Sequence, residues 1–322
     1  MTAAAKLKVA VLDDYQHAAT RFGDWARIAD RADVAIFADH VHDPAAVVAR
    51  LAPFDVVCLM RERTPLSAAM LAQLPNLKLV VTTGVWNAVL DAAAATQRGI
   101  AVCGTQSIHS GTPELIWLLI LALARRLPAE SASVRSGGWQ SAVGADLCGS
   151  TLGLVGLGRI GTHVARVARA FDMRVIAWSP NLTPARAQDA GARFVDKATL
   201  FREADFVSIG LKLSERTHHV VGEAELALMK STAFLINTSR GPLVDEAALV
   251  RALQSGEIAG AGLDVYDVEP LPLDHPFRTL PNVVATPHIG YVTDAQYRVF
   301  FAQTIEDIEA WLAGTPLRII MQ

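Results

Sequence analysis

The sequence has little cysteine, no long apolar run and almost no net charge. Its three cysteines, Cys58, Cys103 and Cys148, are odd in number and far apart, which argues against a disulfide framework and a zinc site and favours a reducing, cytoplasmic location. The longest strongly apolar stretch, Leu115 to Ala124, is shorter than the roughly 20 residues that a membrane helix needs, and residues 1–8 do not look like a signal peptide. A net charge of -3 predicts no general affinity for nucleic acid or membranes. Any phosphate or carboxylate must therefore be bound by local groups.

What is abundant is apolar sequence divided into short runs. Apolar residues make up 52% of the 322 residues and charged residues 19%, which is typical of a packed protein with more than one hydrophobic core. Short β-rich runs alternate with helical stretches, and this alternation predicts parallel sheets covered by helices on both faces. We therefore expect an α/β protein with two doubly wound parallel-sheet domains. The predicted strands cover residues 8–12, 34–37, 55–60, 77–82, 100–103, 151–156, 174–178, 206–211, 233–237, 260–265 and 282–285.

A long helix and a connection separate the two series of alternating strands and helices, and a second long helix follows the last predicted strand. Residues 113–127 predict an apolar helix with a proline in its first turn, and residues 294–313 predict a final amphipathic helix. Residues 131–148 are rich in glycine and serine and are interpreted as a connection. We interpret Asp13, Asp39 and Asp91 as helix caps. The histidines at positions 40, 42, 218 and 219 are interpreted as surface or turn residues, and we expect no metal site.

A glycine-rich turn is the most specific local signal. Gly156, Gly158 and Gly161 form G-x-G-x-x-G directly after an apolar strand and before a helix. This arrangement gives a tight turn, lets the backbone approach a pyrophosphate, and lets the helix pack closely on the strand. The free N–H groups of the helix start favour the negative charge. The turn therefore predicts a dinucleotide site.

The end of the following strand bears on the choice between NAD and NADP. An acid here would bind the ribose 2′-hydroxyl of NAD, but the chain has Ser179 followed by Pro180 and Asn181. The missing carboxylate removes repulsion of a 2′-phosphate, and Arg186 could add attraction. This pattern favours NADP and leaves NAD open, because Ser179 could also bond a ribose hydroxyl.

Three later segments carry candidate chemistry, and each follows an apolar strand. Ligands of open α/β sheets bind at the carboxyl ends of the strands. Arg240 could grip a substrate carboxylate in bidentate fashion. His288 could give or take a proton near neutral pH, and Glu269 could orient its ring and favour the imidazolium. The set suits the reduction of a 2-oxo acid, which needs an anion clamp, a proton donor and a hydride source.

The chain resembles the D-isomer-specific 2-hydroxyacid dehydrogenases. The resemblance rests on VGLGRIG, INTSRGPLVDEAAL, GAGLDVYDVEPLP and NVVATPHIGYVT, and more loosely on MRERTPL and TTGVWNAVLD. It implies a Rossmann cofactor domain, residues 104–294, inserted into a flavodoxin-like substrate domain, residues 1–103 and 295–322. It implies a D-specific reaction on a small acid of the glyoxylate, hydroxypyruvate or 3-phosphoglycerate type. Family members are commonly homodimers, with the helix at residues 113–127 helping to form the interface.

The resemblance also assigns roles to single residues. His288 is the implied acid/base, Glu269 its partner and Arg240 the group that binds the substrate carboxylate and 2-oxo group. The implied cofactor contacts are Gly156, Gly158, Arg159, Ile160, Gly161, Ser179, Thr238, Asp264 and Gly290. The implied substrate contacts are Arg61, Arg240 and the backbone N–H groups of Thr83, Gly84 and Val85.

Several departures from the family pattern keep other interpretations open. Ser179 replaces the usual acid, Trp86 replaces a small or acidic residue, and Ile116 and Gly210 stand where many members carry histidine. The chain length predicts no appended regulatory domain.

One alternative is another enzyme with a Rossmann domain, such as an adenosylhomocysteine hydrolase or an alanine dehydrogenase, but the three later motifs argue against it. The other is a non-catalytic dinucleotide-binding regulator of the corepressor type. All three catalytic positions are filled, which favours an enzyme.

Overall fold

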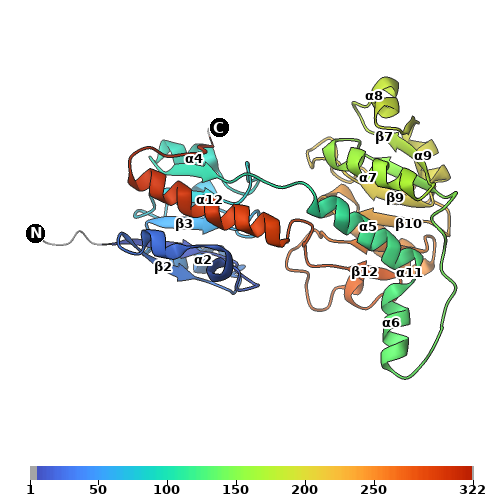
Figure 1. Cartoon of the computed structure of the whole chain (residues 1–322), viewed down its shortest axis with the longest axis horizontal. Coiled ribbons are helices and arrows are strands. Elements are labelled where there is room, and N and C mark those ends of the chain that lie inside the picture. The colour runs from blue at the N-terminus through green and yellow to red at the C-terminus, as the bar shows by residue number, and fades with distance from the viewer. Residues whose placement is uncertain (1–5, 321–322) are drawn as a thin grey trace, which may run out of the picture. The chain divides into compact units, whose positions relative to one another are not determined.

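The computed structural model describes residues 6–320 and divides the chain into two compact units. Unit 1 comprises Met1–Ile108 and Val292–Gln322, and unit 2 comprises His109–Tyr291. The chain therefore leaves unit 1 once and returns to it once, so unit 2 is an insertion in unit 1 (Figure 1).

Unit 1 is built on a five-stranded parallel sheet. Its order is β2-β1-β3-β4-β5, which is the flavodoxin-like order with a topological switch point between β1 and β3. All four residues of β3 and all four of β4 are buried, as expected for parallel strands covered on both faces. The strands are β1 (Leu7–Val11), β2 (Ala32–Ile36), β3 (Val56–Leu59), β4 (Leu79–Thr82) and β5 (Ala101–Gly104).

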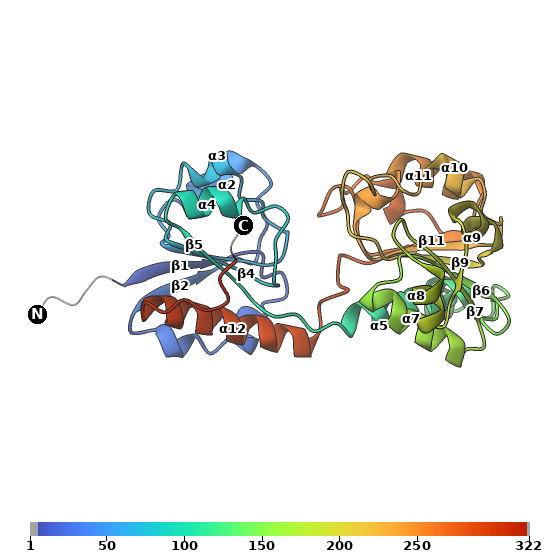
Figure 2. The same ribbon diagram turned by 90° about the horizontal axis from the view of Figure 1, so that it is seen from above.

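Helices cover both faces of this sheet (Figure 2). One face carries α2, α3 and α4, whose apolar residues join the strands in one core. The other face carries the C-terminal helix α12, which contacts β4, β5, α1 and η1. Side chains of Asp43, Ser67, Asp91 and Thr293 accept N–H bonds at the starts of α2, α3, α4 and α12. The bounds are α1 (Ala19–Phe22), η1 (Trp25–Ile28), α2 (Pro44–Leu51), α3 (Ala68–Leu71), α4 (Ala92–Gln97) and α12 (Asp294–Leu312).

Unit 2 is built on a seven-stranded parallel sheet of order β12-β11-β10-β9-β6-β7-β8. From β6 onward this is the Rossmann order, and the switch point lies between β6 and β9. The strands are β6 (Thr151–Val155), β7 (Arg174–Trp178), β8 (Arg193–Phe194), β9 (Phe206–Ile209), β10 (Phe234–Asn237), β11 (Gly260–Leu263) and β12 (Val283–Ala285).

Two hydrophobic cores cover the two faces of the unit 2 sheet. Apolar residues of α5 and α7 form one core with β6 and β7, and residues of α9, α10 and α11 form the other with β9, β10 and β11. In Figure 2 these two helix sets lie on opposite faces of the strands. The helices are α5 (Gly111–Ala124), α6 (Leu127–Arg135), α7 (Arg159–Ala170), α8 (Pro184–Asp189), α9 (Lys197–Glu203), α10 (Glu223–Leu226), α11 (Glu246–Ser255), η2 (Gly241–Leu243) and η3 (Pro276–Arg278).

The structure confirms the predicted fold class and corrects two local interpretations. The stretch 131–148 is not wholly a connection, because α6 extends to Arg135. Asp91 is a cap as predicted, but Asp13 and Asp39 are not: Asp13 bonds side chains of other loops, and Asp39 forms an ion pair with Arg50. Across residues 6–320, no helix is both long and apolar enough to cross a membrane.

Candidate active site

The glycine turn lies at the switch point of the unit 2 sheet, between the end of β6 and the start of α7. Gly156 has φ 110, and a Cβ there would lie 2.6 Å from the carbonyl oxygen of Gly210 at the end of β9. A Cβ at Gly161 would lie 2.6 Å from the carbonyl oxygen of Gly156, so helix and strand meet too closely for a side chain. Gly158 faces open space and caps α7 without any side-chain bond to the first N–H groups. The turn thus fits a pyrophosphate, which would meet backbone alone and the positive end of a twelve-residue helix.

Side chains beside this turn add positive charge. Arg159 opens α7, and together with burial, which is the larger cause, it lowers the pKa of His109. At the end of the neighbouring strand β7, Ser179 is partly buried. The hydroxyl of Thr183 then caps α8, and Nη1 of the exposed Arg186 lies 3.4 Å from the carbonyl of Asn181. No acid occurs between Ser179 and Thr183. The end of β7, where the ribose of a dinucleotide would bind, is therefore neutral, and Arg186 is the next cation along the sequence.

A carboxylate–imidazole pair joins the ends of β11 and β12. Oε2 of Glu269 lies 2.6 Å from Nδ1 of His288, and Oε1 accepts the N–H of Tyr266 at 3.0 Å. An ionised carboxylate can only accept, so the ring proton of this pair resides on Nδ1 and the ring presents Nε2 to its other side. Both side chains are partly exposed, Glu269 by 34% and His288 by 25%. The structure therefore brings together two of the three residues proposed from the sequence as reactive groups.

Asp264 anchors the loop that carries His288. Its carboxylate is fully buried at the end of β11. Oδ1 accepts the Thr286 hydroxyl at 2.6 Å and the Ile289 N–H at 2.7 Å, and Oδ2 accepts the Gly290 N–H at 2.8 Å. Burial raises the pKa of Asp264, and these three hydrogen bonds offset part of that rise. The loop around His288, whose φ of 53 is rare for a residue with a side chain, is thus bound on both sides to one group.

Tyr266 is a part of this site that the sequence analysis missed. Its hydroxyl lies 2.9 Å from the carbonyl of Thr286 and 3.1 Å from that of Leu263, so it links the ends of β12 and β11. Burial raises its pKa above the usual range, which keeps the hydroxyl protonated as a donor. Its backbone N–H donates to Glu269, so Tyr266 binds both Glu269 and the start of the loop that carries His288. The only signal in the sequence is its place in the segment DVYDVEP.

Arg240 follows β10, the strand next to β11. Its backbone carbonyl accepts from Nδ2 of Asn237 at 2.9 Å, and its Nη1 donates to the carbonyl of Ser239 at 2.6 Å. The adjoining Gly241 touches the backbone of Tyr266 so closely that a Cβ would overlap it. Thr238, predicted as a cofactor contact, is buried at the same strand end. The three predicted reactive groups thus arise from the carboxyl ends of three adjacent strands.

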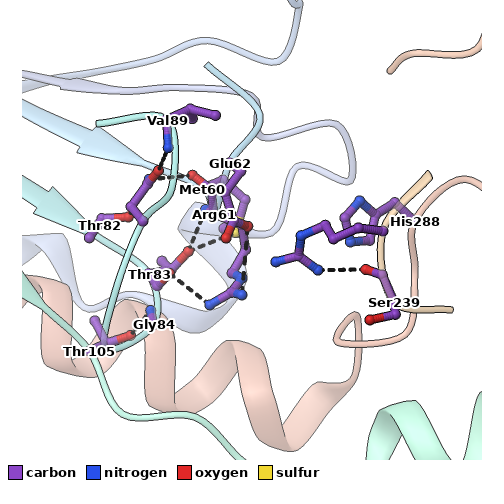
Figure 3. A network of polar contacts seen from close by, with 12 residues as sticks. Met60, Arg61, Glu62, Thr82, Thr83, Gly84, Val89, Thr105, Ser239 and His288 are labelled. Atoms are coloured by element: carbon purple, nitrogen blue, oxygen red, sulfur yellow. Dashed lines mark hydrogen bonds and ion pairs between the residues drawn. The ribbon is translucent and has the colours of Figure 1, made fainter. Parts of the chain in front are cut away.

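Unit 1 has its own cluster at the carboxyl ends of β3 and β4 (Figure 3). The backbone N–H of Arg61 donates to Oγ1 of Thr83 at 2.8 Å, and its Nη1 lies 3.4 Å from the carbonyl of Thr83. The N–H of Thr83 donates to the carbonyl of Leu59, and that of Gly84 donates to Oγ1 of Thr105. The N–H groups of Thr83 and Gly84 are therefore bonded within unit 1, the first in the sheet ladder and the second to a side chain. The expected substrate contacts of Arg61, Thr83, Gly84 and Val85 stay a prediction.

A second carboxylate–histidine pair lies in unit 1. Oδ1 of Asp13 lies 2.8 Å from Nδ1 of His40, and Oδ2 accepts the hydroxyl of Thr64 at 2.6 Å. The side chains are 2% and 9% exposed, so His40 is a loop residue, as one half of the prediction has it, but its side chain is not on the surface. Its ring meets that of His42 edge to face at 4.5 Å. Within the described part of the chain, no three His, Cys, Asp or Glu side chains are grouped as metal ligands would be.

A Rossmann sheet with an open glycine turn, beside a carboxylate–imidazole pair, defines a dinucleotide-binding α/β protein. Residues 117–290 match the model of the D-isomer specific 2-hydroxyacid dehydrogenase NAD-binding domain. The glyoxylate reductase of Thermococcus litoralis is 43% identical over 234 residues, which are 70% of each chain. The glyoxylate/hydroxypyruvate reductase B of Klebsiella pneumoniae is 42% identical over 242 residues, 73% of this chain and 75% of that one. A phosphoglycerate oxidoreductase from Vibrio cholerae superposes with a TM-score of 0.90 at 35% identity, covering 96% of this chain and 99% of that structure.

These matches cover more than half of the chain and include its whole glycine turn. The chain belongs to the D-isomer specific 2-hydroxyacid dehydrogenase family, and unit 2 contains its NAD-binding domain. The resemblance inferred from the sequence is confirmed. The alternative of an adenosylhomocysteine hydrolase or alanine dehydrogenase is thereby set aside.

Proposed function

We propose that this protein transfers a hydride between a nicotinamide dinucleotide and C2 of a small 2-oxo or 2-hydroxy acid, with D configuration of the hydroxy acid. The observation that carries the proposal is the 2.6 Å contact between Glu269 and His288. Glyoxylate, hydroxypyruvate and 3-phosphoglycerate share the carboxylate and the reacting carbon, and we propose a substrate of this type. The similarity to glyoxylate and hydroxypyruvate reductases supports the first two.

In this proposal His288 moves the proton. The carboxylate of Glu269 holds Nδ1, so Nε2 is the atom that gives a proton to the substrate oxygen during reduction and removes it during oxidation. A bound nicotinamide would supply or accept the hydride. Arg240 would bind the substrate carboxylate through its planar guanidinium and stabilise charge that develops on the oxygen at C2. For unit 1 we keep as proposed substrate contacts Arg61 and the backbone N–H groups of Thr83, Gly84 and Val85.

The cofactor would be held by the glycine turn and its neighbours. Besides Gly156, Gly158 and Gly161, the proposed contacts are Arg159, Ile160, Ser179, Thr238, Asp264 and Gly290. We propose NADP in preference to NAD because the end of β7 is neutral and Arg186 is close to it in the chain. A comparison of NADPH and NADH at saturating substrate tests this preference. Ser179→Asp should shift the ratio of kcat/KM values toward NADH, and a wild-type preference for NADH would contradict the proposal.

We also propose that the protein is a cytoplasmic homodimer that acts without a metal. Leu118 and Leu121 on α5 and Leu127 at the start of α6 are 52%, 39% and 53% exposed. An apolar row of this kind favours association. Sedimentation of the wild type beside Leu118→Glu tests the dimer, which the charge should weaken.

The main test is cofactor oxidation with a panel of 2-oxo acids. Turnover of glyoxylate or hydroxypyruvate, with a D-configured product from hydroxypyruvate, would support the proposed function. The matching aldehydes without a carboxylate should be poor substrates, because the anion clamp would have nothing to bind. Arg240→Ala should lower kcat/KM for the acids strongly. If no 2-oxo acid is reduced with either cofactor, the proposed function is wrong, and a non-catalytic dinucleotide-binding protein becomes the better account.

A further inference from the structure

Asn87 links two loops of unit 1 that no motif connects. One loop, residues 60–64, follows β3 and carries Arg61, and the other, residues 83–91, follows β4 and carries Asn87 itself. We propose that Asn87 is a positioning residue that fixes Arg61 for capture of the substrate carboxylate. This inference rests on the proposed function, because it takes Arg61 as a substrate contact.

Arg61 has a backbone conformation that needs support. Its φ of 54 lies in the left-handed region, where residues with a side chain are uncommon. Such a conformation persists only where the surroundings determine it more strongly than local preference does. Both polar backbone groups of Arg61 are held by side chains: its N–H donates to Oγ1 of Thr83 at 2.8 Å, and its carbonyl accepts from Nδ2 of Asn87 at 2.8 Å.

The amide of Asn87 is fully used and has one possible orientation. Nδ2 donates to the Arg61 carbonyl and also to Oγ1 of Thr82 at 2.9 Å, while Oδ1 accepts the N–H of Val89 at 3.0 Å. Only the NH₂ group can donate to a carbonyl, and only the oxygen can accept an N–H, so exchanging the two ends would lose these bonds. The residue is 3% exposed, and therefore water does not replace a lost partner easily.

The backbone of Arg61 decides where its guanidinium lies. Nη1 is 3.4 Å from the Thr83 carbonyl and occupies the space that a Cβ of Gly84 would take, while Nη2 is 3.6 Å from Oε2 of Glu62. Figure 3 shows the Arg61 side chain turned toward Thr83 and Gly84. If the peptide of Arg61 turned over, the guanidinium would leave this place. Asn87 therefore determines the position of the Arg61 guanidinium, and we do not expect it to contact the substrate itself.

This arrangement predicts an effect on substrate capture and not on chemistry. Asn87→Asp keeps the shape and the acceptor for Val89, but places a carboxylate oxygen against the Arg61 carbonyl, which can only accept, whereas the Thr82 hydroxyl can turn and donate. We expect KM for the 2-oxo acid to rise about tenfold, which is the cost of roughly one hydrogen bond to a buried group, while kcat changes little. Asn76→Asp is the matched control, because Nδ2 of Asn76 also donates to a backbone carbonyl of unit 1, that of Ala52, but at an exposed place.

A double-mutant cycle separates positioning from general damage. If Asn87 acts through Arg61, Asn87→Asp should raise KM much less in the Arg61→Ala background than in the wild type. Thr82→Val, which removes the second acceptor of the amide and keeps the shape, provides a milder variant should Asn87→Asp fold poorly. It should raise KM in the same direction by a smaller factor.

Amide hydrogen exchange of residues 60–66 gives a readout that needs no substrate, and Asn87→Asp should speed it. Turnover of the wild type is measured first, and its absence would contradict the proposed function rather than the role of Asn87. With an active wild type, the positioning role is overturned if Asn87→Asp and Thr82→Val leave KM and the exchange of this loop unchanged. It is also overturned if Asn87→Asp lowers kcat alone, or if its effect on KM is the same with and without Arg61.

Discussion

The two units each contain a carboxylate bonded to Nδ1 of a histidine, yet the two pairs differ in burial and in the partner of the second carboxylate oxygen. Asp13 and His40 are 2% and 9% exposed, whereas Glu269 and His288 are 34% and 25% exposed. The second oxygen of Asp13 accepts the Thr64 hydroxyl, and the His40 ring is covered by that of His42. The second oxygen of Glu269 accepts the backbone N–H of Tyr266, and the His288 ring meets that of Tyr291 edge to face at 5.6 Å. We therefore interpret the buried pair of unit 1 as a structural contact, and we keep the proposed proton transfer for the more exposed pair of unit 2.

The largest expected difference comes from replacing the two histidines. His288→Asn should lower kcat by roughly 10²–10⁴-fold, because it removes the proton donor. The variant should still bind the reduced cofactor, which can be measured by the fluorescence of the cofactor. His40→Asn keeps a donor close to the position of Nδ1 and should leave kcat close to that of the wild type. Normal turnover by His288→Asn would exclude it as the proton donor.

Replacing the carboxylates should separate activity from stability. Glu269→Gln should lower kcat by roughly 10–100-fold, because a charge-assisted hydrogen bond of about 1.5–3 kcal/mol is lost from the reacting ring. Asp13→Asn should instead lower the free energy of unfolding by a similar amount, since an amide has only one acceptor oxygen and one of the two partners, His40 or Thr64, loses its hydrogen bond. Steady-state kinetics of both variants measures the loss of kcat, and urea unfolding measures the loss of the free energy of unfolding. Equal losses of kcat in the two variants would remove the distinction between the pairs.

A third carboxylate, that of Asp307 in α12, shows the effect of burial on a carboxyl group that has no histidine partner. Its side chain is fully buried and lies 3.0 Å from Nε of Arg318, and its Oδ2 has no partner within residues 6–320. Burial raises its pKa from 3.8 to about 7, although Arg318 lowers it in part. The folded protein therefore keeps a proton that the unfolded chain releases, so the free energy of unfolding should fall as the pH rises through this interval. We expect a loss of about 2 kcal/mol between pH 5.5 and 8 in urea unfolding, and Asp307→Asn should abolish most of this loss. An unchanged pH dependence in that variant would locate the titration elsewhere.

The smallest expected effect comes from two buried tyrosines. Tyr266→Phe removes the hydroxyl that links the ends of β11 and β12, and should cost about 1 kcal/mol of stability and a few-fold in kcat. Tyr297→Phe in unit 1 removes a hydroxyl that donates to Oε1 of Gln16, and should affect stability alone. Parallel kinetics and thermal unfolding decide between these outcomes. A loss of kcat in Tyr297→Phe but not in Tyr266→Phe would reverse the assignment.

The sequence predicted the sheets well because buried strands show themselves as apolar runs. It did not predict helix α6, Leu127–Arg135, since α6 buries none of its residues and so has no apolar face to detect. Amphipathic patterning reports only the faces that a helix buries against its own chain. The shift of β2 from the predicted 34–37 to Ala32–Ile36 reflects polar residues at a sheet edge, which weaken the same signal.

The site was predictable only where chemistry follows a strand end. Glu269 and His288 were placed from their positions after apolar runs, because parallel strands bring their carboxyl ends to one edge. Asp13 and His40 are 27 residues apart, and Asn87 and Arg61 are 26 apart, with no motif to connect them. Such contacts depend on loop conformations with positive φ at Asp13 and Arg61, which local preference disfavours and which only the assembled fold determines.

The single carboxylate of Asp264 has a consequence for laboratory evolution of this enzyme. Because it binds one hydroxyl and two backbone N–H groups of the loop around His288, a substitution of Asp264 would release the loop at all three points together. Val85 and Trp86, by contrast, are 69% and 40% exposed at the end of β4. On the proposed function, a library that varies these two side chains would change the substrate contacts of unit 1 and keep Asp264, so diversity is better placed there.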